Sequence, residues 1–201
     1  GIYFLGALEE VWNKHSPNNI HTYIGCSVGG LIAFLLIIGY TPKDLIGLFL
    51  HVNLPKYMLS FNFGILFSQY GIDNGNKLLN ILNILAKAKD IPINITFQEL
   101  QQKTNKKFIV ACTRLETNTC IYLDYENYPD VGVIEGIMGS CSIPLLFTPR
   151  YIKNIGTVLD GAVKDFFPIH LCDSKCNVLG IIMNNWEDID DDNDGIFDWL
   201  D

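Results

Sequence analysis

The amino-acid sequence predicts an α/β fold in three layers, α/β/α, with a largely parallel central sheet. Strand-like and helical patterns alternate along the chain, which is typical of this class. Residues 31–38 and 178–183 carry no polar side chain, as expected for elements that are covered on all sides. A length of 201 residues, with no linker or internal repeat, favours a single domain with a full hydrophobic core.

Helical patterns dominate the first part of the chain. Apolar spacing predicts a helix over 2–14, a short strand over 21–24 and an all-apolar interior helix over 28–38. Thr41, Pro42 and Asp44 supply an N-cap, a first-turn proline and an acid matched to the helix dipole, for a helix that ends near residue 50.

The second part alternates helices with strands. A helix is expected over 76–89, and Thr96 with Glu99 forms a capping box that begins another. The elements expected after it are strands over 107–113 and 119–123, a helix over 131–138 and a buried strand over 178–183.

The net charge of −8 arises at the C-terminal end. Eight of the 22 acidic residues lie in 187–201, which contains no Lys or Arg, so the other 14 balance the 14 basic residues. A nucleic-acid-binding protein needs a basic surface, and the only local basic run is Lys103, Lys106 and Lys107. We therefore expect no nucleic-acid partner. Membrane contact by this neutral body would rest on apolar surface and depend little on salt.

The cysteines and the longest apolar run indicate in which cell compartment the protein is expected and whether it could span a membrane. Six cysteines occur without paired C-x-x-C spacings, and no signal peptide is recognisable. We expect reduced thiols in a cytoplasmic protein, with no metal and no other cofactor. The longest wholly apolar run, 31–38, has eight residues, whereas a membrane-spanning helix needs about 20.

The segment Gly25-Cys26-Ser27-Val28-Gly29 is the strongest local signal for catalysis. It fits a nucleophile elbow, a tight strand-to-helix turn that exposes a serine and needs small residues on both sides, here Gly25 and Gly29. The helix N-terminus beneath Ser27 would favour negative charge at the reacting oxygen. Ser27 is therefore the candidate nucleophile. The alternative is a glycine-rich turn with an incidental serine.

Two residues are candidates for the base that activates Ser27. His170 fits the order Ser, Asp, His, but it lies only ten residues after Asp160, which is a tight spacing for two members of a triad. Asp160 precedes Gly161 and Ala162, so it lies on a small-residue turn from which a carboxylate can reach a serine directly. The residues alone leave both alternatives open.

These residues resemble the patatin-like phospholipases, serine acyl hydrolases with a Ser-Asp dyad. The elbow matches the family's G-x-S-x-G, and Asp160-Gly161-Ala162 matches its D-G-G or D-G-A element. Segments 96–100, 111–117 and 140–144 are similar to intermediate family segments in the same order. The resemblance implies a patatin-like domain with Ser27 as nucleophile, Asp160 as proton acceptor and, as motif support, Gly25, Gly29, Gly161 and Ala162.

The sequence departs from the family pattern at its beginning. The family's glycine-rich oxyanion loop precedes its first helix, and only Gly1 can correspond to the last glycine of that loop. We expect residues 1–201 to be one patatin-like catalytic domain, trimmed at both ends, with the rest of the oxyanion loop upstream of residue 1. Loss of an oxyanion donor costs about 100- to 1000-fold in rate, so these residues alone should be nearly inactive.

The resemblance implies a lipid acyl hydrolase of the phospholipase A or lysophospholipase type, which cleaves carboxylic esters of glycerolipids or phospholipids through an acyl-enzyme. Such a protein would act in the cytoplasm, in peripheral contact with membranes. Two alternatives remain. One is a catalytically silent lipid-binding or scaffold protein of the same fold, and the other is a Ser-Asp-His esterase for soluble esters that uses His170.

Two other segments carry hypotheses of their own. Residues 51–71 are rich in large apolar side chains and would suit a mobile flap beside a lipid site, or ordinary packing over the sheet. The acidic end follows the spacing of an EF-hand calcium loop, with a solvated loop as the alternative. The residues at that spacing are Asp190, Asp192, Asp194, Gly195 and Asp201.

Overall fold

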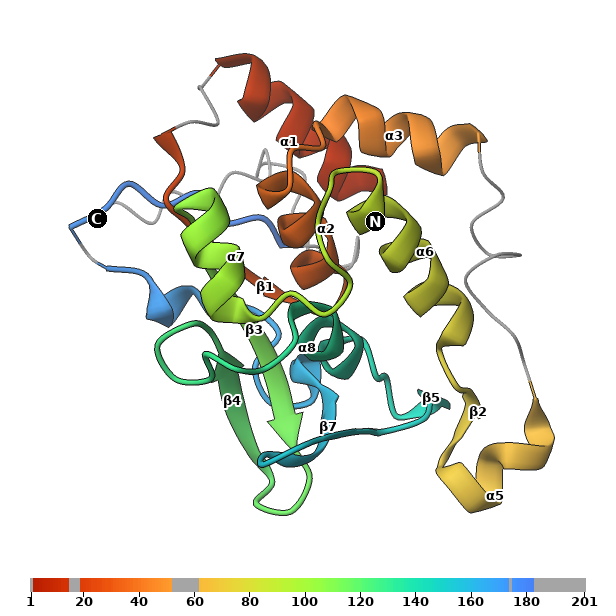
Figure 1. Ribbon diagram of the computed structural model, residues 1–201. Helices are drawn as coiled ribbons and strands as arrows, with labels where there is room; N and C mark the ends of the chain where they lie inside the picture. Colours follow the sequence, from red (N-terminus) through yellow and green to blue (C-terminus); the bar gives the residue numbers. More distant parts are fainter. Residues whose placement is uncertain (1, 15–18, 52–61, 174, 183–201) are drawn as a thin grey trace, which may run out of the picture.

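The computed structural model describes residues 2–14, 19–51, 62–173 and 175–182 (Figure 1). The helices are α1 (Ile2–Lys14), α2 (Val28–Ile37), α3 (Pro42–His51), α5 (Leu66–Gln69), α6 (Asn76–Lys87), α7 (Phe97–Thr104) and α8 (Val133–Ser140). The strands are β1 (Thr22–Cys26), β2 (Gly71–Asp73), β3 (Lys107–Arg114), β4 (Thr119–Leu123), β5 (Leu145–Phe147), β6 (Arg150–Ile152) and β7 (Gly156–Asp160). Short 3-10 turns are η2 (Phe63–Ile65), η3 (Gly161–Val163) and η4 (Ile169–Leu171).

Strand β3 is the centre of the main sheet and pairs along both of its edges. β1 runs parallel to its first half, with Cys26 opposite Ala111. β7 runs antiparallel to its second half, with Asp160 opposite Cys112. Because β4 pairs with both Ala111 and Cys112, β1 and β7 must share the other edge of β3. The two strands therefore meet end to end, which brings the residue after β1 beside the last residue of β7.

The main sheet is mixed. β1 and β3 are parallel, whereas β3–β4, β3–β7 and β6–β7 are antiparallel, and β2 with β5 forms a separate parallel pair. The predicted α/β class is confirmed, and the sheet is less parallel than expected. The reason is that β3–β4 and β6–β7 are hairpins, whose short connections require antiparallel strands.

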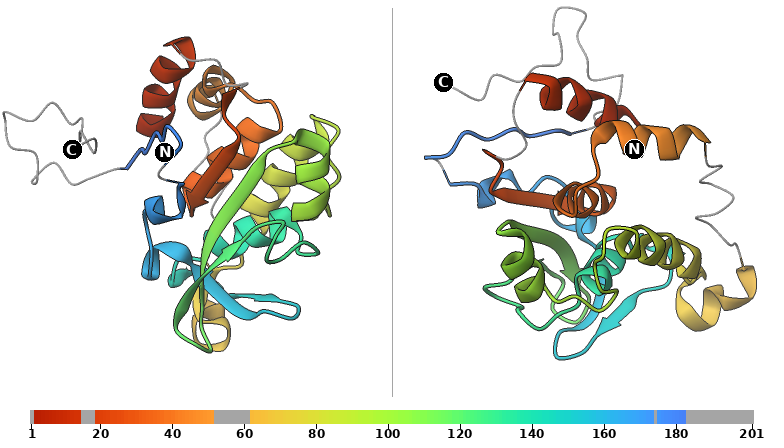
Figure 2. Two further views of the ribbon diagram at one scale, coloured as in Figure 1. Left: turned by 90° about the vertical axis from the view of Figure 1, so that its left-hand side faces the viewer. Right: turned by 45° about the horizontal axis from the view of Figure 1, so that its top comes forward.

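Helices α2, α7 and α8 cover one face of the sheet. Phe108, Val110 and Cys112 alternate along β3 and so point to the same side. The ring of Phe108 lies 6.3 Å from that of Phe34 on α2 and 5.8 Å from that of Phe97 on α7. The Cys112 thiol donates to a backbone carbonyl of α8. Figure 2 shows the helices gathered on this side of the sheet, with α6 next to α8.

The opposite face of the sheet is covered mainly by 3-10 turns and extended chain. Tyr122 contacts η4 and Cys26 contacts η3. Ile24 faces residues 166–169 and 178–181 together with Phe4 of α1. Among the described residues, the second helical layer expected from the sequence is represented by α1, against which α3 packs. The segment after β7 takes the place of further helices.

The strand expected over 178–183 is not formed in the described part of that range. Residues 178–182 pair with no strand of the described chain, and Val178, Leu179 and Ile181 line a cavity beside β1 instead. Both the pairing and the burial expected here are wrong, since Val178 is 47% exposed and Leu179 is 57% exposed. A short apolar run does not by itself establish strand pairing.

The other predicted elements are present with small shifts at their ends. α7 carries the predicted capping box, in which Thr96 Oγ1 accepts from the Glu99 N–H and the Glu99 carboxylate accepts from the Thr96 N–H. β2, β5 and β6 were not predicted, because three residues each are too few to show a strand period. None of the helices in the described ranges has the length and apolarity needed to cross a membrane.

Helix α2 packs on β1 through a contact between two glycines. A Cβ atom on Gly25 would lie 2.4 Å from the Cα atom of Gly30, so no larger residue fits at position 25 without a backbone shift. The elbow motif predicts the same steric need at Gly29, and this prediction is wrong. A Cβ atom there would meet no described atom within 4 Å, because α2 crosses Gly25 at Gly30.

We predict that Gly25→Ala lowers the free energy of unfolding by about 1–3 kcal/mol, because its Cβ atom would overlap the backbone of α2. Gly29→Ala is the control and should leave stability unchanged or raise it by roughly 0.5–1 kcal/mol, since Ala is the better helix former. Urea titration of both variants measures the difference. Equal destabilisation by the two substitutions would contradict the packing described here.

Candidate active site

Ser27 occupies the turn between β1 and α2 in a strained backbone conformation. Its φ of 52° and ψ of −127° lie outside the regions that L-residues ordinarily adopt. The turn is tight, because β1 ends at Cys26 and α2 begins at Val28. Ser27 thus has the strand-turn-helix setting that the elbow motif requires.

A short hydrogen bond joins Ser27 to Asp160. The Ser27 hydroxyl donates to Asp160 Oδ2 at 2.6 Å. The contact follows from the sheet, since β1 and β7 end at neighbouring positions on the same edge of β3. The structure therefore brings together the two residues that the sequence analysis expected to act as nucleophile and proton acceptor.

The Asp160 carboxylate is buried, with 3% of the residue exposed, and it accepts three hydrogen bonds. Besides Ser27, the donors are the backbone N–H of Ala162 at 2.9 Å and the thiol of Cys26 at 3.8 Å, both to Oδ1. Burial raises the pKa of Asp160 above its ordinary value of 3.8, and the three hydrogen bonds oppose that rise. A raised pKa makes this carboxylate a stronger base than an exposed aspartate.

The backbone of Asp160 is held on both sides. Its N–H donates to the Ser142 carbonyl at 3.0 Å, and its carbonyl accepts from the Thr113 hydroxyl at 2.9 Å. The next residue must be glycine, because a Cβ atom on Gly161 would lie 2.4 Å from the carbonyl oxygen of Ala111. Each residue of the Asp-Gly-Ala element thus has its own role. Asp160 supplies the carboxylate, Gly161 leaves room for the Ala111 carbonyl, and Ala162 donates its backbone N–H to the carboxylate.

Ser140 supports the elbow, a role that the sequence analysis did not assign. Its hydroxyl accepts from the backbone N–H of Ser27 at 2.8 Å and donates to the carbonyl of Ala111 at 2.6 Å. The side chain is fully buried at the end of α8. It therefore fixes the strained turn to the central strand. In the sequence, segment 140–144 is distinguished only by its resemblance to the family, and no local pattern predicts this contact.

The thiols around Asp160 remain protonated. Burial, together with the nearby Asp160 carboxylate, raises the pKa of Cys141 to about 12 and moves the pKa of Cys26 in the same direction. All six cysteines lie in the described residues and all are free. Cys26 therefore takes part in the site as a hydrogen-bond donor.

His170 lies in a separate cluster. Its Nε2 is 3.2 Å from the Tyr122 hydroxyl, and its Nδ1 is 3.7 Å from Asp165 Oδ2. The Tyr122 hydroxyl donates to the same carboxylate at 2.6 Å. The Ser27 hydroxyl bonds to Asp160, and the ring nitrogens of His170 contact Tyr122 and Asp165 instead.

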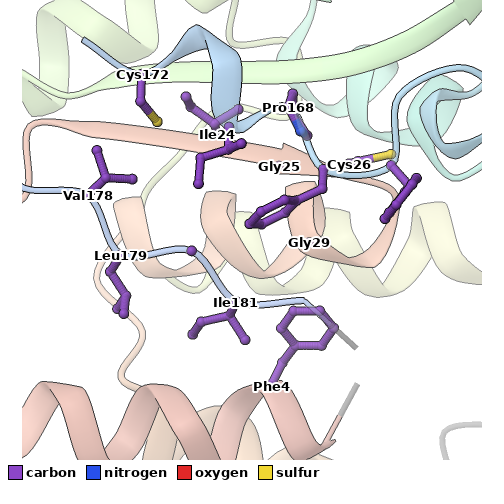
Figure 3. Close-up of a pocket in the computed structure, with 14 residues that line it drawn as sticks. Phe4, Ile24, Gly25, Cys26, Gly29, Pro168, Cys172, Val178, Leu179 and Ile181 are labelled. Carbon is purple, nitrogen blue, oxygen red and sulfur yellow. The ribbon is translucent and has the colours of Figure 1, made fainter. Parts of the chain in front are cut away.

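An apolar cavity of about 130 Å³ lies next to the elbow (Figure 3). Gly25, Cys26 and Gly29 form its wall toward the site. Figure 3 shows the segment with Leu179 and Ile181 passing between β1 and Phe4. The cavity therefore borders the candidate nucleophile from the β1 side.

Several expected sites fall outside the described residues. These are Gly1 as an oxyanion glycine, residues 52–61 of the flap proposed over 51–71, and the calcium loop of Asp190 to Asp201. Within the described ranges, no group of three His, Cys, Asp or Glu residues could hold a metal ion.

Comparison with known proteins shows the family of the chain. The model of the family described as Patatin-like phospholipase matches residues 1–173. "Probable lipid hydrolase 463L" of Invertebrate iridescent virus 6 is 34% identical over 194 residues, which cover 92% of this chain and 64% of that protein. Protein R571 of Acanthamoeba polyphaga mimivirus is 27% identical over 196 residues, which cover 95% of this chain and 64% of that protein. The chain thus spans somewhat less than two thirds of the length of these relatives.

Similarity to a solved structure supports the fold. VipD from Legionella pneumophila aligns with a TM-score of 0.58 at 17% identity, over 82% of this chain and 44% of that structure. The family match includes the elbow at Ser27 and the Asp160 element. The chain belongs to the patatin-like phospholipase family.

Proposed function

We propose that the full-length protein is a lipid acyl hydrolase that uses a Ser27-Asp160 dyad. The observation that carries this proposal is the 2.6 Å hydrogen bond from the Ser27 hydroxyl to a buried Asp160 carboxylate. Family membership and a relative named as a probable lipid hydrolase support lipid esters as the substrate class.

The proposed reaction passes through an acyl-enzyme. Asp160 takes the hydroxyl proton of Ser27 while Ser27 Oγ attacks the ester carbonyl carbon. The alcohol then leaves with that proton, and the acyl group remains on Ser27. In the second half, Asp160 takes a proton from water, the hydroxide attacks the acyl carbon, and Ser27 recovers its proton as the fatty acid leaves.

Helix α2 supports the negative charge that develops on the carbonyl oxygen. Its first backbone hydrogen bond runs from the Leu31 N–H to the Ser27 carbonyl. The N–H groups of Val28, Gly29 and Gly30 therefore come before the helical ladder, at the positive end of the helix dipole.

The proposed substrate is a glycerolipid or phospholipid, reached by peripheral contact with a cytoplasmic membrane surface. We infer the substrate from the family and the membrane contact from the apolar lining of the cavity beside the elbow. The cytoplasmic location remains a prediction from the cysteine pattern. The two rivals are a silent lipid-binding protein of this fold and an esterase that uses His170, and the contacts of Asp160 favour the dyad over the latter.

We predict that Ser27→Ala and Asp160→Asn each reduce ester hydrolysis by the full-length protein at least about 1000-fold, because each removes one half of the dyad. His170→Ala is the matched test of the rival base and should retain activity within a few-fold. Release of fatty acid from phospholipid is the measurement. Retained activity in either dyad variant would sink the proposal, and loss in His170→Ala would favour the esterase.

We also predict that Ser140→Ala lowers kcat as well as stability. Its removal leaves the Ser27 N–H and the Ala111 carbonyl without a partner, at a cost of about 1–3 kcal/mol in the free energy of unfolding. Ser142→Ala is the control, because its buried hydroxyl donates to the Met138 carbonyl and does not touch Ser27. Both variants should lose stability, and only Ser140→Ala should lose roughly tenfold or more in kcat. Equal kcat values would contradict a positioning role for Ser140.

A further inference from the structure

Three consecutive apolar residues, Ile143, Pro144 and Leu145, are exposed on the turn that leads from α8 into β5. Ile143 is 42% exposed and Leu145 is 69% exposed. Tyr70 is 71% exposed and lies beside them, because the next residue, Gly71, pairs with Leu145. We call these four residues the apolar ridge. A run of exposed apolar residues is unfavourable in water and generally marks a contact surface.

The backbone of the apolar ridge is held in conformations that large residues avoid. Leu145 has a φ of 68° and Tyr70 has a φ of 57°, both in the left-handed region. Leu145 therefore costs free energy twice, through backbone strain and through its exposed side chain. A glycine or asparagine would relieve both costs, so the leucine is explained better by a contact that covers it than by folding.

The apolar ridge is continuous with the candidate active site. The Ser140 hydroxyl accepts from the Ser27 N–H, and the Ser142 carbonyl accepts from the Asp160 N–H. Ile143 follows directly in the sequence. One short segment therefore supports both members of the dyad and then turns outward as the apolar ridge, while Val28, next to the nucleophile, is itself 38% exposed.

The turn is suited to an apolar environment. Segment 143–146 carries no charged side chain. Several of its backbone groups are bonded locally, since the N–H groups of Leu146 and Phe147 both donate to the Ile143 carbonyl. Such bonds lower the cost of placing backbone in lipid, and an exposed tyrosine suits the boundary between lipid and water.

We propose that the apolar ridge inserts into the surface of a phospholipid membrane and so brings Ser27 to the lipid. This inference rests on the proposed function, since it assigns the surface through which that site meets its substrate. The absence of charge on the turn and its continuity with the dyad favour a lipid surface over a protein partner. Contact of this kind is apolar, so neutral lipid is sufficient.

The test measures binding of the full-length Ser27→Ala protein to phosphatidylcholine vesicles by co-sedimentation. Ile143→Asn with Leu145→Asn should weaken binding at least about tenfold, because two apolar side chains leave the membrane. Leu115→Asn is the matched control, since Leu115 is 52% exposed between the charged residues Arg114 and Glu116. It should bind within about twofold of the parent. Binding should change little between about 0.05 and about 0.5 M salt.

The single variant Leu145→Asn distinguishes a loss of membrane contact from a loss of folding. Asn tolerates a positive φ, so this variant should keep the thermal midpoint of the parent. Its binding to vesicles should be weaker by at least roughly threefold. Unchanged binding in a folded ridge variant overturns the proposal. A steep dependence of vesicle binding on salt also overturns it. So does a parent protein that is a dimer and becomes monomeric in the ridge variants, since a second copy would then cover the apolar ridge.

The experiment separates this inference from the proposed function. The Ser27→Ala background does not hydrolyse lipid, so its binding does not depend on catalysis. Ridge-dependent binding by a protein that never hydrolyses esters would keep the apolar ridge as a membrane contact and remove the dyad. Lipid hydrolysis by a protein whose vesicle binding is unchanged in the ridge variants would keep the dyad and remove the apolar ridge as a membrane contact.

Discussion

The end-to-end meeting of β1 and β7 on one edge of β3 is the constraint on which the candidate site depends. Cys26 pairs with Ala111, and Asp160 pairs with Cys112. Ser27, the residue after Cys26, therefore comes within hydrogen-bond distance of Asp160 across the gap between the strands. A shift of β7 by one residue would turn the Asp160 side chain to the other face of the sheet. The pairing of Ser27 with Asp160 is therefore as well defined as the register of the sheet.

The surroundings of the dyad combine strain with close support. The unusual φ of Ser27 is held by Ser140, and the buried Asp160 is held by Thr113, Ser142 and its own turn. Such strain persists where the neighbouring structure over-determines it, and it is concentrated at functional sites. Since burial also raises the pKa of Asp160, the fold that fixes its position also makes it a stronger base.

Local sequence patterns predicted the elements that carry the site, but not the contacts between them. The capping box at Thr96, the apolar helix after Ser27 and the Gly25 requirement are local properties, and they were confirmed. The mixed sheet, the missing strand over 178–183 and the role of Ser140 depend on contacts between distant segments, which no local pattern encodes. The steric reason given for Gly29 was wrong because the helix crosses the strand one residue later. Asp160 was an open alternative to His170 until the family resemblance singled it out.

The rate at which a fluorophosphonate probe labels Ser27, measured against pH in the full-length protein and in Asp160→Asn, tests the central claim most directly. Asp160 accepts the serine proton only when it is ionised. Labelling of the parent protein should therefore fall as the pH drops through a pKa above 3.8, the ordinary value for aspartate. Asp160→Asn should label roughly 100-fold or more slowly and lose this pH dependence. Equal labelling of both proteins across the pH range would contradict direct activation of Ser27 by Asp160.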